Sequence, residues 1–579
     1  MLYTRKFDSL QPYATMRVFL ESELDLNTHK KASHSWWHDL VLLTVLISTI
    51  FAIFLGSRPL NVPDEGRYCE IPREMLVSGD FVTPRINGIK YFEKPPLFYW
   101  MQAASLRVFG QSDRSCRLMD ALMSLFGCLG IYAAGRKLYN PKAGLFSAVI
   151  LASSLLYFAL ARVITLDMTV SIFLTFSLLS FILGVYSSKY FYYFVYIFAG
   201  LAVLTKGLIG IIFPCSIIFL WLFFTRQWKI LKECKLITGV LLFLLITVPW
   251  HVIVQLRNPE FFYFYFIDQQ FVRYLTLEAH RYQPDWFYIP ILLLGLVPWT
   301  GFLWGGLKNV LKYHKSDPKS FYLLLSFIFI FVFYSLSKSK LVPYILPCFG
   351  FLSLLIGKYF ADLVEKGIHK NNVLLFGFLL NSALFMLLSI VVPLSLSVEL
   401  TTNYRQAVSC IPIIVYLCLA NTFFVPLVYW IKGFVLAFVL QCILAVCVFL
   451  SLCNLAPYIY MDSVKPFAEK INSLIKPNDK VFVYDYYYQD LPFYLNRLVT
   501  IVDWKGELEF GSHYSHDKNV MIDNTEFWQY WNNRKDESQS AFMVIPKDTF
   551  ATVQNKFIRE NYYIMATTKN DLLIRRVAK

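Results

Sequence analysis

Long apolar blocks dominate this sequence and set its architecture. Blocks such as 38–57, 236–255 and 433–456 run for about 20 residues, the length that an α-helix needs to cross roughly 30 Å of hydrocarbon. Hydrophobic residues make up 57% of the chain and charged residues only 16%, against about 25% in a typical soluble domain. The sequence therefore predicts an α-helical polytopic membrane protein and excludes a disordered chain, a coiled coil and an ordinary cytosolic enzyme.

Apolar blocks recur along most of the chain and predict about thirteen transmembrane helices. The first block is too long for the core of a signal peptide and no small-residue cleavage site follows it, so we expect it to remain as an anchor. The blocks lie near residues 38–57, 116–135, 143–161, 168–186, 190–205, 207–224, 236–255, 286–306, 321–336, 341–357, 373–395, 410–430 and 433–456.

The basic residues of the loops predict the orientation of the chain. There are 54 Lys+Arg and 39 Asp+Glu residues, which give a net charge of +15. With a cytoplasmic N-terminus, residues such as Lys229, Lys232 and Lys312 fall in loops that stay inside, as the positive-inside rule requires. Topology thus explains the positive excess, and no nucleic acid partner is indicated.

This orientation divides the chain into three parts. We expect a cytoplasmic N-terminal extension over 1–37, a transmembrane catalytic domain over 38–456 and a soluble periplasmic domain over 457–579. Within the catalytic domain, the long loops 58–115 and 256–285 would face the outer side.

Short elements are expected on that outer side. An amphipathic helix over Leu97–Phe109 can lie in the membrane interface. In the C-terminal domain, helical stretches at 463–475 and 524–534 alternate with β-rich runs at 480–486 and 498–503. This alternation predicts a small α/β domain.

Charged side chains near the outer ends of the spans are the candidates for a functional site. An ionisable group in the hydrocarbon costs about 2.5–3.5 kcal/mol on insertion scales, so such a group indicates function. Each one alone has a structural interpretation, because carboxylates cap helix N-termini and lysines reach toward headgroups. Their convergence on one membrane face favours a site. The candidates are Asp64, Glu65, Arg67, Arg162, Asp167, Lys206, Lys338 and Lys340.

Ordered motifs in the first outer loop resemble a known family. Pro63-Asp-Glu-Gly-Arg-Tyr68, Arg73-Glu-Met-Leu76, Ser78-Gly-Asp80 and Tyr91-Phe-Glu-Lys-Pro-Pro-Leu97 are similar to the lipid A aminoarabinose transferases. These enzymes are relatives of the protein O-mannosyltransferases among the multi-span glycosyltransferases that use polyprenyl-phosphate sugars. The similarity runs from about residue 40 to 510. Further similar stretches are Arg162 to Asp167, Leu204-Thr-Lys-Gly207, Ser337 to Pro347, Gln489 to Leu495 and Thr500 to Asp503.

The resemblance implies the multi-span C-type glycosyltransferase fold and an activity. An amino sugar would move from undecaprenyl phosphate to a lipid A phosphate at the periplasmic face of a bacterial inner membrane. The product would carry less negative charge and resist cationic antimicrobial peptides. The resemblance favours aminoarabinose as the transferred sugar, and a hexosamine such as galactosamine is the alternative. Gly66 and Pro72 replace better helix formers of the family, so we expect the helix after Asp64 to be kinked or displaced.

A lipid-linked sugar phosphate needs cations for its phosphate and carboxylates near its sugar. We expect Asp64, Asp167 and Glu65 to be the catalytic carboxylates, which orient the acceptor, act as base or bind a cationic group of the sugar. Transfer by a single displacement would invert the anomeric carbon. The expected ligands of the donor phosphate are Arg67, Lys94, Arg162, Lys206, Lys338, Lys340 and Tyr344.

A divalent metal ion is a further hypothesis, and no other cofactor is indicated. Glu93 and His280 would supply oxygen and nitrogen ligands from two outer loops. Two alternative functions remain open. One is a protein O-mannosyltransferase or another polyprenyl-phosphate-sugar transferase with a protein or glycan acceptor. The other is a transporter of lipid-linked sugars, which the absence of a visible internal repeat disfavours.

Overall fold

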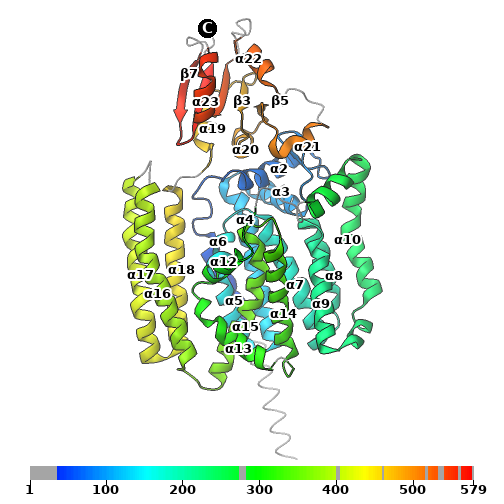
Figure 1. The fold of residues 1–579 in the computed structure, drawn as a ribbon, viewed down its shortest axis with the longest axis vertical. Helices are drawn as coiled ribbons and strands as arrows, with labels where there is room; N and C mark the ends of the chain where they lie inside the picture. The colour runs from blue at the N-terminus through cyan, green and yellow to red at the C-terminus, as the bar shows by residue number, and fades with distance from the viewer. Residues whose placement is uncertain are drawn as a thin grey trace, which may run out of the picture. The chain divides into compact units, whose positions relative to one another are not determined.

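The computed structural model describes residues 36–272, 282–313, 315–399, 404–458, 462–514, 520–532, 540–557 and 562–576. The chain divides into two units, Met1–Ile50 and Phe51–Lys579. An apolar helix, Trp36–Ala52, begins in the first unit. The second unit combines a bundle of long helices with a C-terminal domain built on a sheet (Figure 1). The predicted class, a helical membrane protein with a C-terminal α/β domain, is confirmed.

Eight helices in the described ranges are long and apolar enough to cross a membrane, judged by length and composition. The apolar helices α5 (Pro141–Ala152), α8 (Phe191–Lys206) and α9 (Ile209–Thr225) are shorter. The eight are α4 (Asp113–Leu138), α7 (Leu166–Tyr186), α10 (Leu236–Arg257), α14 (Pro318–Leu336), α15 (Leu346–Glu365) with the turn η4 (Val342–Ile345), α16 (Asn372–Glu399), α17 (Tyr404–Lys432) and α18 (Phe434–Leu455).

Two blocks that we predicted as single spans are broken. Block 143–161 divides into α5 and α6 (Leu155–Leu160), because the Ser153 and Ser154 hydroxyls bond back to carbonyls of the preceding turn. Block 286–306 divides at Pro298, which has no N–H with which to continue a helix. Its parts are α12 (Tyr288–Gly295) and, after the turn η3 (Thr300–Phe302), α13 (Leu303–Tyr313), and they differ in direction by 102°.

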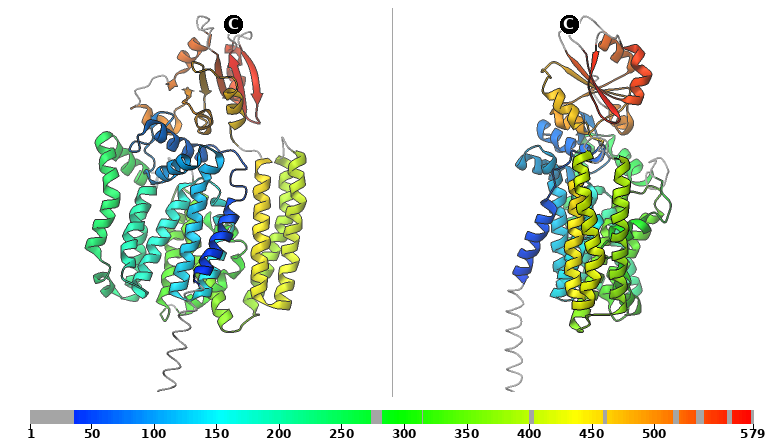
Figure 2. Two further views of the ribbon diagram at one scale, coloured as in Figure 1. Left: turned by 180° about the vertical axis from the view of Figure 1, so that it is seen from behind. Right: turned by 90° about the vertical axis from the view of Figure 1, so that its left-hand side faces the viewer.

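The first predicted outer loop folds into two short helices at one end of the bundle, next to the C-terminal domain (Figure 2). They are α2 (Asp64–Ser78) and α3 (Leu97–Phe109), and the hairpin β1 (Arg85–Ile86) and β2 (Ile89–Lys90) lies between them in sequence. Helix α2 runs unbroken through Pro72, and the expected kink or displacement stays a prediction. It ends at Gly79, whose φ of +71° suits glycine.

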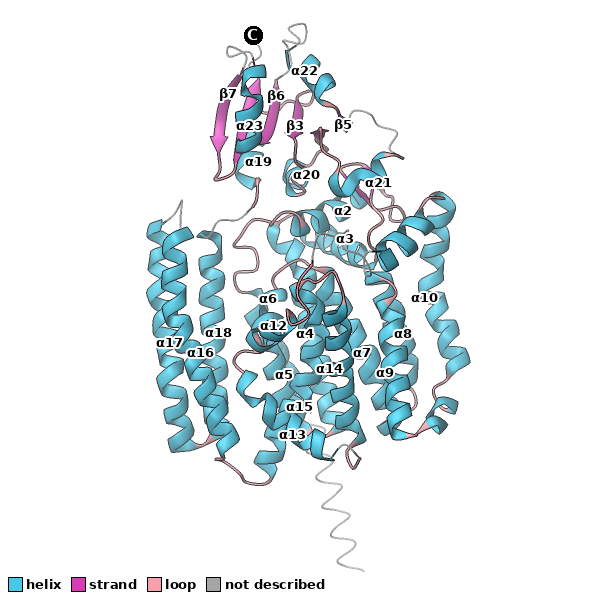
Figure 3. Ribbon diagram, in the orientation of Figure 1, coloured by secondary structure: helices cyan, strands magenta, loops and turns pink. Residues whose placement is uncertain are grey.

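The C-terminal domain contains a six-stranded mixed sheet in the order β5-β4-β3-β6-β8-β7 (Figure 3). The first four strands in this order are parallel, and β8 and β7 continue antiparallel. Both predicted β runs and both predicted helices are present. The strands are β3 (Lys480–Tyr484), β4 (Thr500–Val502), β5 (Met521–Ile522), β6 (Ala541–Pro546), β7 (Tyr562–Thr567) and β8 (Asp571–Arg576), and the helices are α19 (Lys465–Asn472), α20 (Asp490–Leu495), α21 (Glu509–Ser512), α22 (Asn524–Asn532) and α23 (Lys547–Val553).

One hydrophobic core joins this domain to α2 and α3. Alternate residues of β3 face opposite sides of the sheet, so Val481 and Val483 pack in the same core as Tyr68 of α2 and Leu491 of α20. A Cβ on Gly66 would lie 2.5 Å from the backbone nitrogen of Asp490, so this glycine permits the close approach of α20. The first turn of α2 is therefore held between the helical bundle and the C-terminal domain.

Candidate functional site

The N-terminal end of α7 and the C-terminal end of α8 bring three predicted residues together. Thr165 caps α7, because its hydroxyl oxygen accepts a bond from the Asp167 N–H at 3.2 Å. The Asp167 carboxylate is thus not the cap, and it pairs with Lys206 of α8. The Lys206 ammonium also lies 4.0 Å from the centre of the Tyr344 ring. Asp167, Lys206 and Tyr344 form one cluster.

A second cluster surrounds Arg67 in the first turns of α2. Its guanidinium lies 3.2 Å from Asp64 and also pairs with Glu507 of the C-terminal domain, which accepts a 2.8 Å bond from Gln489. Burial alone would lower the pKa of Arg67, but Tyr91, Glu507 and Glu93 outweigh it and raise the pKa. A buried arginine fixed in its charged form thus stands beside an Asp64 carboxylate that is 55% exposed.

The charges of both clusters act on Tyr68, a buried residue of α2. Its pKa is raised by burial and further by the nearby charges of Asp64 and Asp167. Both carboxylates therefore act on one phenol although they are about a hundred residues apart in sequence. Lys94 lies in the same loop as Tyr91 and donates to the carbonyl of Glu93 at 2.9 Å. The geometry brings together carboxylates and cations that can hold a phosphate and a sugar between them.

Glu65 has a different environment from its neighbour Asp64. Its carboxylate receives bonds of 2.6 and 2.8 Å from Arg58 and of 3.1 and 2.7 Å from Arg117. The backbone N–H groups of Asn61 and Ile164 donate to it at 3.0 and 3.1 Å. Burial would raise the pKa of Glu65, but the two arginines lower it to about 2. A carboxylate with six such contacts is suited to holding three segments together rather than to accepting a proton.

The remaining predicted residues have other environments. The Arg162 guanidinium stacks 3.9 Å from the Phe158 ring and lines a separate crevice with Arg58 and apolar residues of α18. Lys340 is buried and donates to the Gln283 carbonyl at 2.8 Å, while Lys338 is exposed. His280 lies outside the described residues, so the proposed metal pair is visible only at Glu93. Among the residues that are described, no group of three His, Cys, Asp or Glu side chains could hold a metal ion.

Several residues of the site were missed by the sequence analysis. Arg117 and Asp120 are fully buried in α4, inside the predicted span 116–135, so the rule that singled out the other charges would have found them. Asp120 accepts a 3.3 Å bond from the Thr165 N–H and so helps to position the start of α7. Glu507 carries no such signal, because it lies in a polar domain far along the chain from Arg67.

Two family models match the chain. One, described as dolichyl-phosphate-mannose-protein mannosyltransferase, matches residues 93–253. The other, described as aminoarabinose transferase C-terminal domain, matches residues 467–575 and so extends beyond residue 510, where the motif resemblance ended.

Curated relatives match the chain over part of its length. An undecaprenyl phosphate-alpha-4-amino-4-deoxy-L-arabinose arabinosyl transferase of Proteus mirabilis is 36% identical over 334 residues, which are 56% of this chain and 60% of that protein. A protein of the same name in Aeromonas hydrophila is 33% identical over 319 residues, 54% of this chain and 58% of that protein. The matched part of the chain thus spans about 60% of the length of these relatives.

Solved structures extend the likeness to nearly the whole chain. The crystal structure of ArnT from Cupriavidus metallidurans in the apo state covers 94% of this chain and 99% of that protein, with 27% identity and a TM-score of 0.80. The structure of the same protein bound to undecaprenyl phosphate covers 93% of this chain and 98% of that protein, with 28% identity and a TM-score of 0.79. In its C-terminal family model, its curated relatives and its fold over nearly the whole chain, the protein is similar to the aminoarabinose transferases.

Proposed function

We propose that this protein transfers 4-amino-4-deoxy-L-arabinose from undecaprenyl phosphate to a phosphate of lipid A, at the periplasmic face of a bacterial inner membrane. The observation that carries the proposal is the pairing of Asp167 with Lys206 beside Tyr344. The bond from the Ile164 N–H to Glu65 ties the start of α7 to the turn of α2 that carries Asp64 and Arg67. The relatives named above act, by their names, on the same donor class.

The cations of the site would bind the donor phosphate. Lys206 has an apolar stem in α8 and its ammonium lies against Tyr344, so it is suited to a lipid phosphate at the membrane surface. Lys94 and Arg67 would stabilise the charge that builds on the phosphate as it leaves. Lys338 and Lys340 shortly precede Tyr344 in sequence and stay proposed ligands of the donor phosphate. Arg162 stacks on Phe158, so the geometry supports its role in phosphate binding least.

The two carboxylates would face the sugar and the acceptor. A lipid A phosphate is anionic at neutral pH, so it needs little deprotonation and Asp64 and Asp167 mainly orient reactants or bind the sugar's ammonium. A phosphate oxygen of the acceptor forms a bond to the anomeric carbon while the bond from that carbon to the donor oxygen breaks. Undecaprenyl phosphate leaves with the electron pair, and the anomeric configuration inverts.

Glu65 would then be a positioning residue and not a base. It ties Arg58, Arg117 and the loop before α7, and so fixes Asp64 and Asp167 relative to each other. Glu93 and His280 stay a hypothesis for a divalent metal, which chelation of purified protein followed by metal analysis would test.

Mass spectrometry of lipid A tests the proposed function. Deleting the protein should remove a sugar-modified lipid A species, and the mass increment that disappears distinguishes a pentose such as aminoarabinose from a hexosamine. An unchanged lipid A spectrum, recorded under conditions where the protein is expressed, would contradict the proposal.

The match of residues 93–253 to the mannosyltransferase model favours one alternative, a transferase with a protein acceptor. The match of residues 467–575 to the aminoarabinose transferase domain favours the lipid acceptor. Glycoprotein staining of wild-type and deletion strains separates the two, because only a protein acceptor predicts a lost glycoprotein band.

A further inference from the structure

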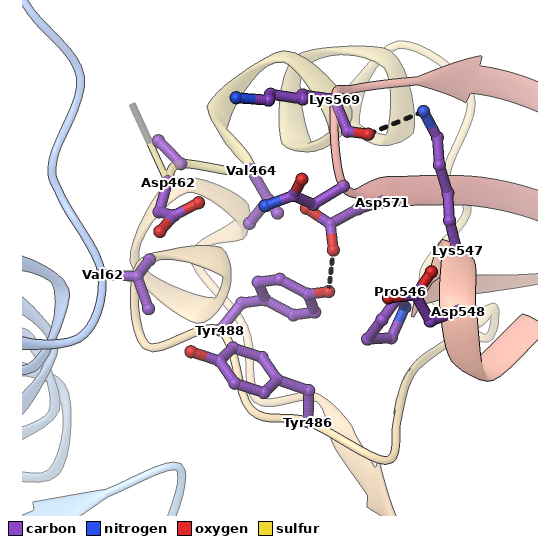
Figure 4. Close-up of a pocket in the computed structure, with 12 residues that line it drawn as sticks. Val62, Asp462, Val464, Tyr486, Tyr488, Pro546, Lys547, Asp548, Lys569 and Asp571 are labelled. Carbon is purple, nitrogen blue, oxygen red and sulfur yellow. Dashed lines mark hydrogen bonds between the residues drawn. The ribbon is translucent and has the colours of Figure 1, made fainter. Parts of the chain in front are cut away.

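A cavity of about 440 Å³ opens where the C-terminal domain meets the segment that precedes α2 (Figure 4). Val62, two residues before Asp64, forms one wall. The other walls come from the segment before α19, the segment after β3, and the ends of β6 and β8. A volume of this size is within the range of small-molecule sites.

The polar groups of this cavity suit a sugar. Tyr488 is buried and donates to Asp571 at 2.5 Å, and Tyr486 packs against it with ring centres 4.9 Å apart. Tyr486 is 39% exposed, so a second flat group can pack on its ring. Asp462 lies across the cavity from these rings (Figure 4). Carboxylates accept bonds from hydroxyl groups, and an exposed aromatic ring packs against the apolar face of a pyranose.

The charge of the lining disfavours a phosphate. Asp462, Asp548 and Asp571 line the cavity with Lys547 and Lys569, so carboxylates outnumber ammonium groups. Lys547 also donates to the backbone carbonyl of Lys569 at 2.8 Å, which holds one ammonium against the wall. The cavity is therefore better suited to the uncharged ring of a glycolipid headgroup than to its phosphate.

A short series of contacts connects the cavity to Asp64. The wall residues Ser463 and Val464 donate to one oxygen of Asp490 at 2.7 and 3.1 Å. Gln489, the preceding residue, bonds Glu507, and Glu507 pairs with the Arg67 that contacts Asp64. On the opposite wall, the Val62 N–H donates to the Asp462 carbonyl at 3.0 Å.

From this geometry we infer that the cavity is the acceptor subsite, which binds the sugar rings of the lipid A headgroup and directs the phosphate toward Asp64 and Arg67. The inference rests on the proposed function. Lipid A keeps its acyl chains in the membrane and its sugars above it, and the cavity lies beyond the end of the helical bundle, where the C-terminal domain meets the segment before α2. The carboxylates of the cavity repel the phosphate, and the cations around Asp64 attract it.

Steady-state transfer with the purified full chain tests the subsite. Tyr486→Ala and Asp462→Asn should raise the KM for lipid A about tenfold, the loss expected for one aromatic stack or one hydrogen bond to a charged group. The KM for the donor and the kcat at saturating acceptor should not change. Tyr486→Phe keeps the ring and should behave as wild type.

Tyr563→Ala is the matched control, because Tyr563 is a 44% exposed tyrosine on β7 of the same domain and lies outside the cavity. The inference is overturned if Tyr486→Ala and Asp462→Asn leave the KM for lipid A at the wild-type value. If the wild-type protein transfers no sugar to lipid A, the proposed function fails. The affinity of the donor-free protein for lipid A then tests whether the cavity is the acceptor subsite. Weaker binding by Tyr486→Ala would then support the subsite, and unchanged binding would overturn it.

Discussion

Asp64 and Glu65 are consecutive residues, yet their carboxylates lie in opposite environments. Glu65 is buried and bonded to Arg58 and Arg117, whereas Asp64 is 55% exposed and contacts Arg67. Successive helical residues point about 100° apart, so the first turn of α2 presents one carboxylate to the helical bundle and the other to the clusters that face the C-terminal domain.

The difference separates an anchor from a reactive group. A carboxylate whose lone pairs are all engaged holds segments in place but cannot contact a substrate. An exposed carboxylate beside a fixed cation can do so. We therefore expect the Glu65 anchor to control stability, and the Asp64 and Asp167 carboxylates to control turnover.

Removal of the anchor should have the largest effect. Glu65→Gln leaves the buried Arg117 and the half-buried Arg58 without their counter-charge, which should cost about 3–5 kcal/mol of folding stability. The melting temperature of the purified protein and its monodisperse yield measure this loss. A Glu65→Gln protein that melts at the wild-type temperature would show that the anchor is not structural.

Acid should abolish the same stabilisation. The pKa of Glu65 in the folded protein, about 2, is below its ordinary value of 4.5. The contribution is therefore fully present above the unfolded pKa and is lost as the pH falls from about 4.5 toward 2. Wild-type protein should lose more melting temperature than Glu65→Gln across this window, and parallel curves would contradict the assignment.

Neutralising the exposed Asp64 or the buried Asp167, which pairs with Lys206, should have the next largest effect. Asp64→Asn and Asp167→Asn keep size and hydrogen bonding, and each should reduce transfer by roughly 100-fold or more, about 2.7 kcal/mol, without lowering the melting temperature. Lys312→Met, at the opposite end of the bundle, is the control and should be fully active. Wild-type rates in both Asn variants would exclude these residues from the reaction.

Much of this arrangement could be predicted from the sequence. Helix α3 begins and ends at Leu97 and Phe109 as expected, because amphipathic periodicity is a local property. The break of block 143–161 could not be predicted from hydropathy, since Ser153 and Ser154 differ little from apolar neighbours in a window average. The difference between Asp64 and Glu65 depends on Arg117, which is distant in sequence. The local motif therefore predicted the same catalytic role for both carboxylates.

Gly66→Ala should have an intermediate effect and reports on the interface between the anchor and the C-terminal domain. In an ordinary helix this change stabilises by about 0.5–1 kcal/mol. Here the new Cβ would meet the backbone of Gln489 and Asp490 at 2.8 and 2.5 Å, and overpacking should cost about 1–3 kcal/mol. Thermal unfolding gives the sign. A higher melting temperature would show that α20 does not pack closely on α2.

Lys206→Met should have the smallest effect of these variants. It removes the ion pair with Asp167 but keeps the stem, so we expect the KM for the donor to rise about tenfold, or about 1.4 kcal/mol. Lys312→Met is the matched control, because Lys312 is exposed and lies at the opposite end of the bundle, and it should change the KM by less than about twofold. If both substitutions act equally, the Asp167 and Lys206 cluster has no special role in donor binding.

Measuring the transfer rate and the melting temperature on the same preparations of Asp64→Asn and Glu65→Gln tests the central claim most directly. We predict that Asp64→Asn melts with the wild type but transfers at most about one hundredth as fast per folded molecule. Glu65→Gln should melt at a much lower temperature, yet its folded fraction should retain a rate within about tenfold of wild type. The opposite result, with the stability loss in Asp64→Asn and the large rate loss in folded Glu65→Gln, would contradict the division into anchor and reactive carboxylates.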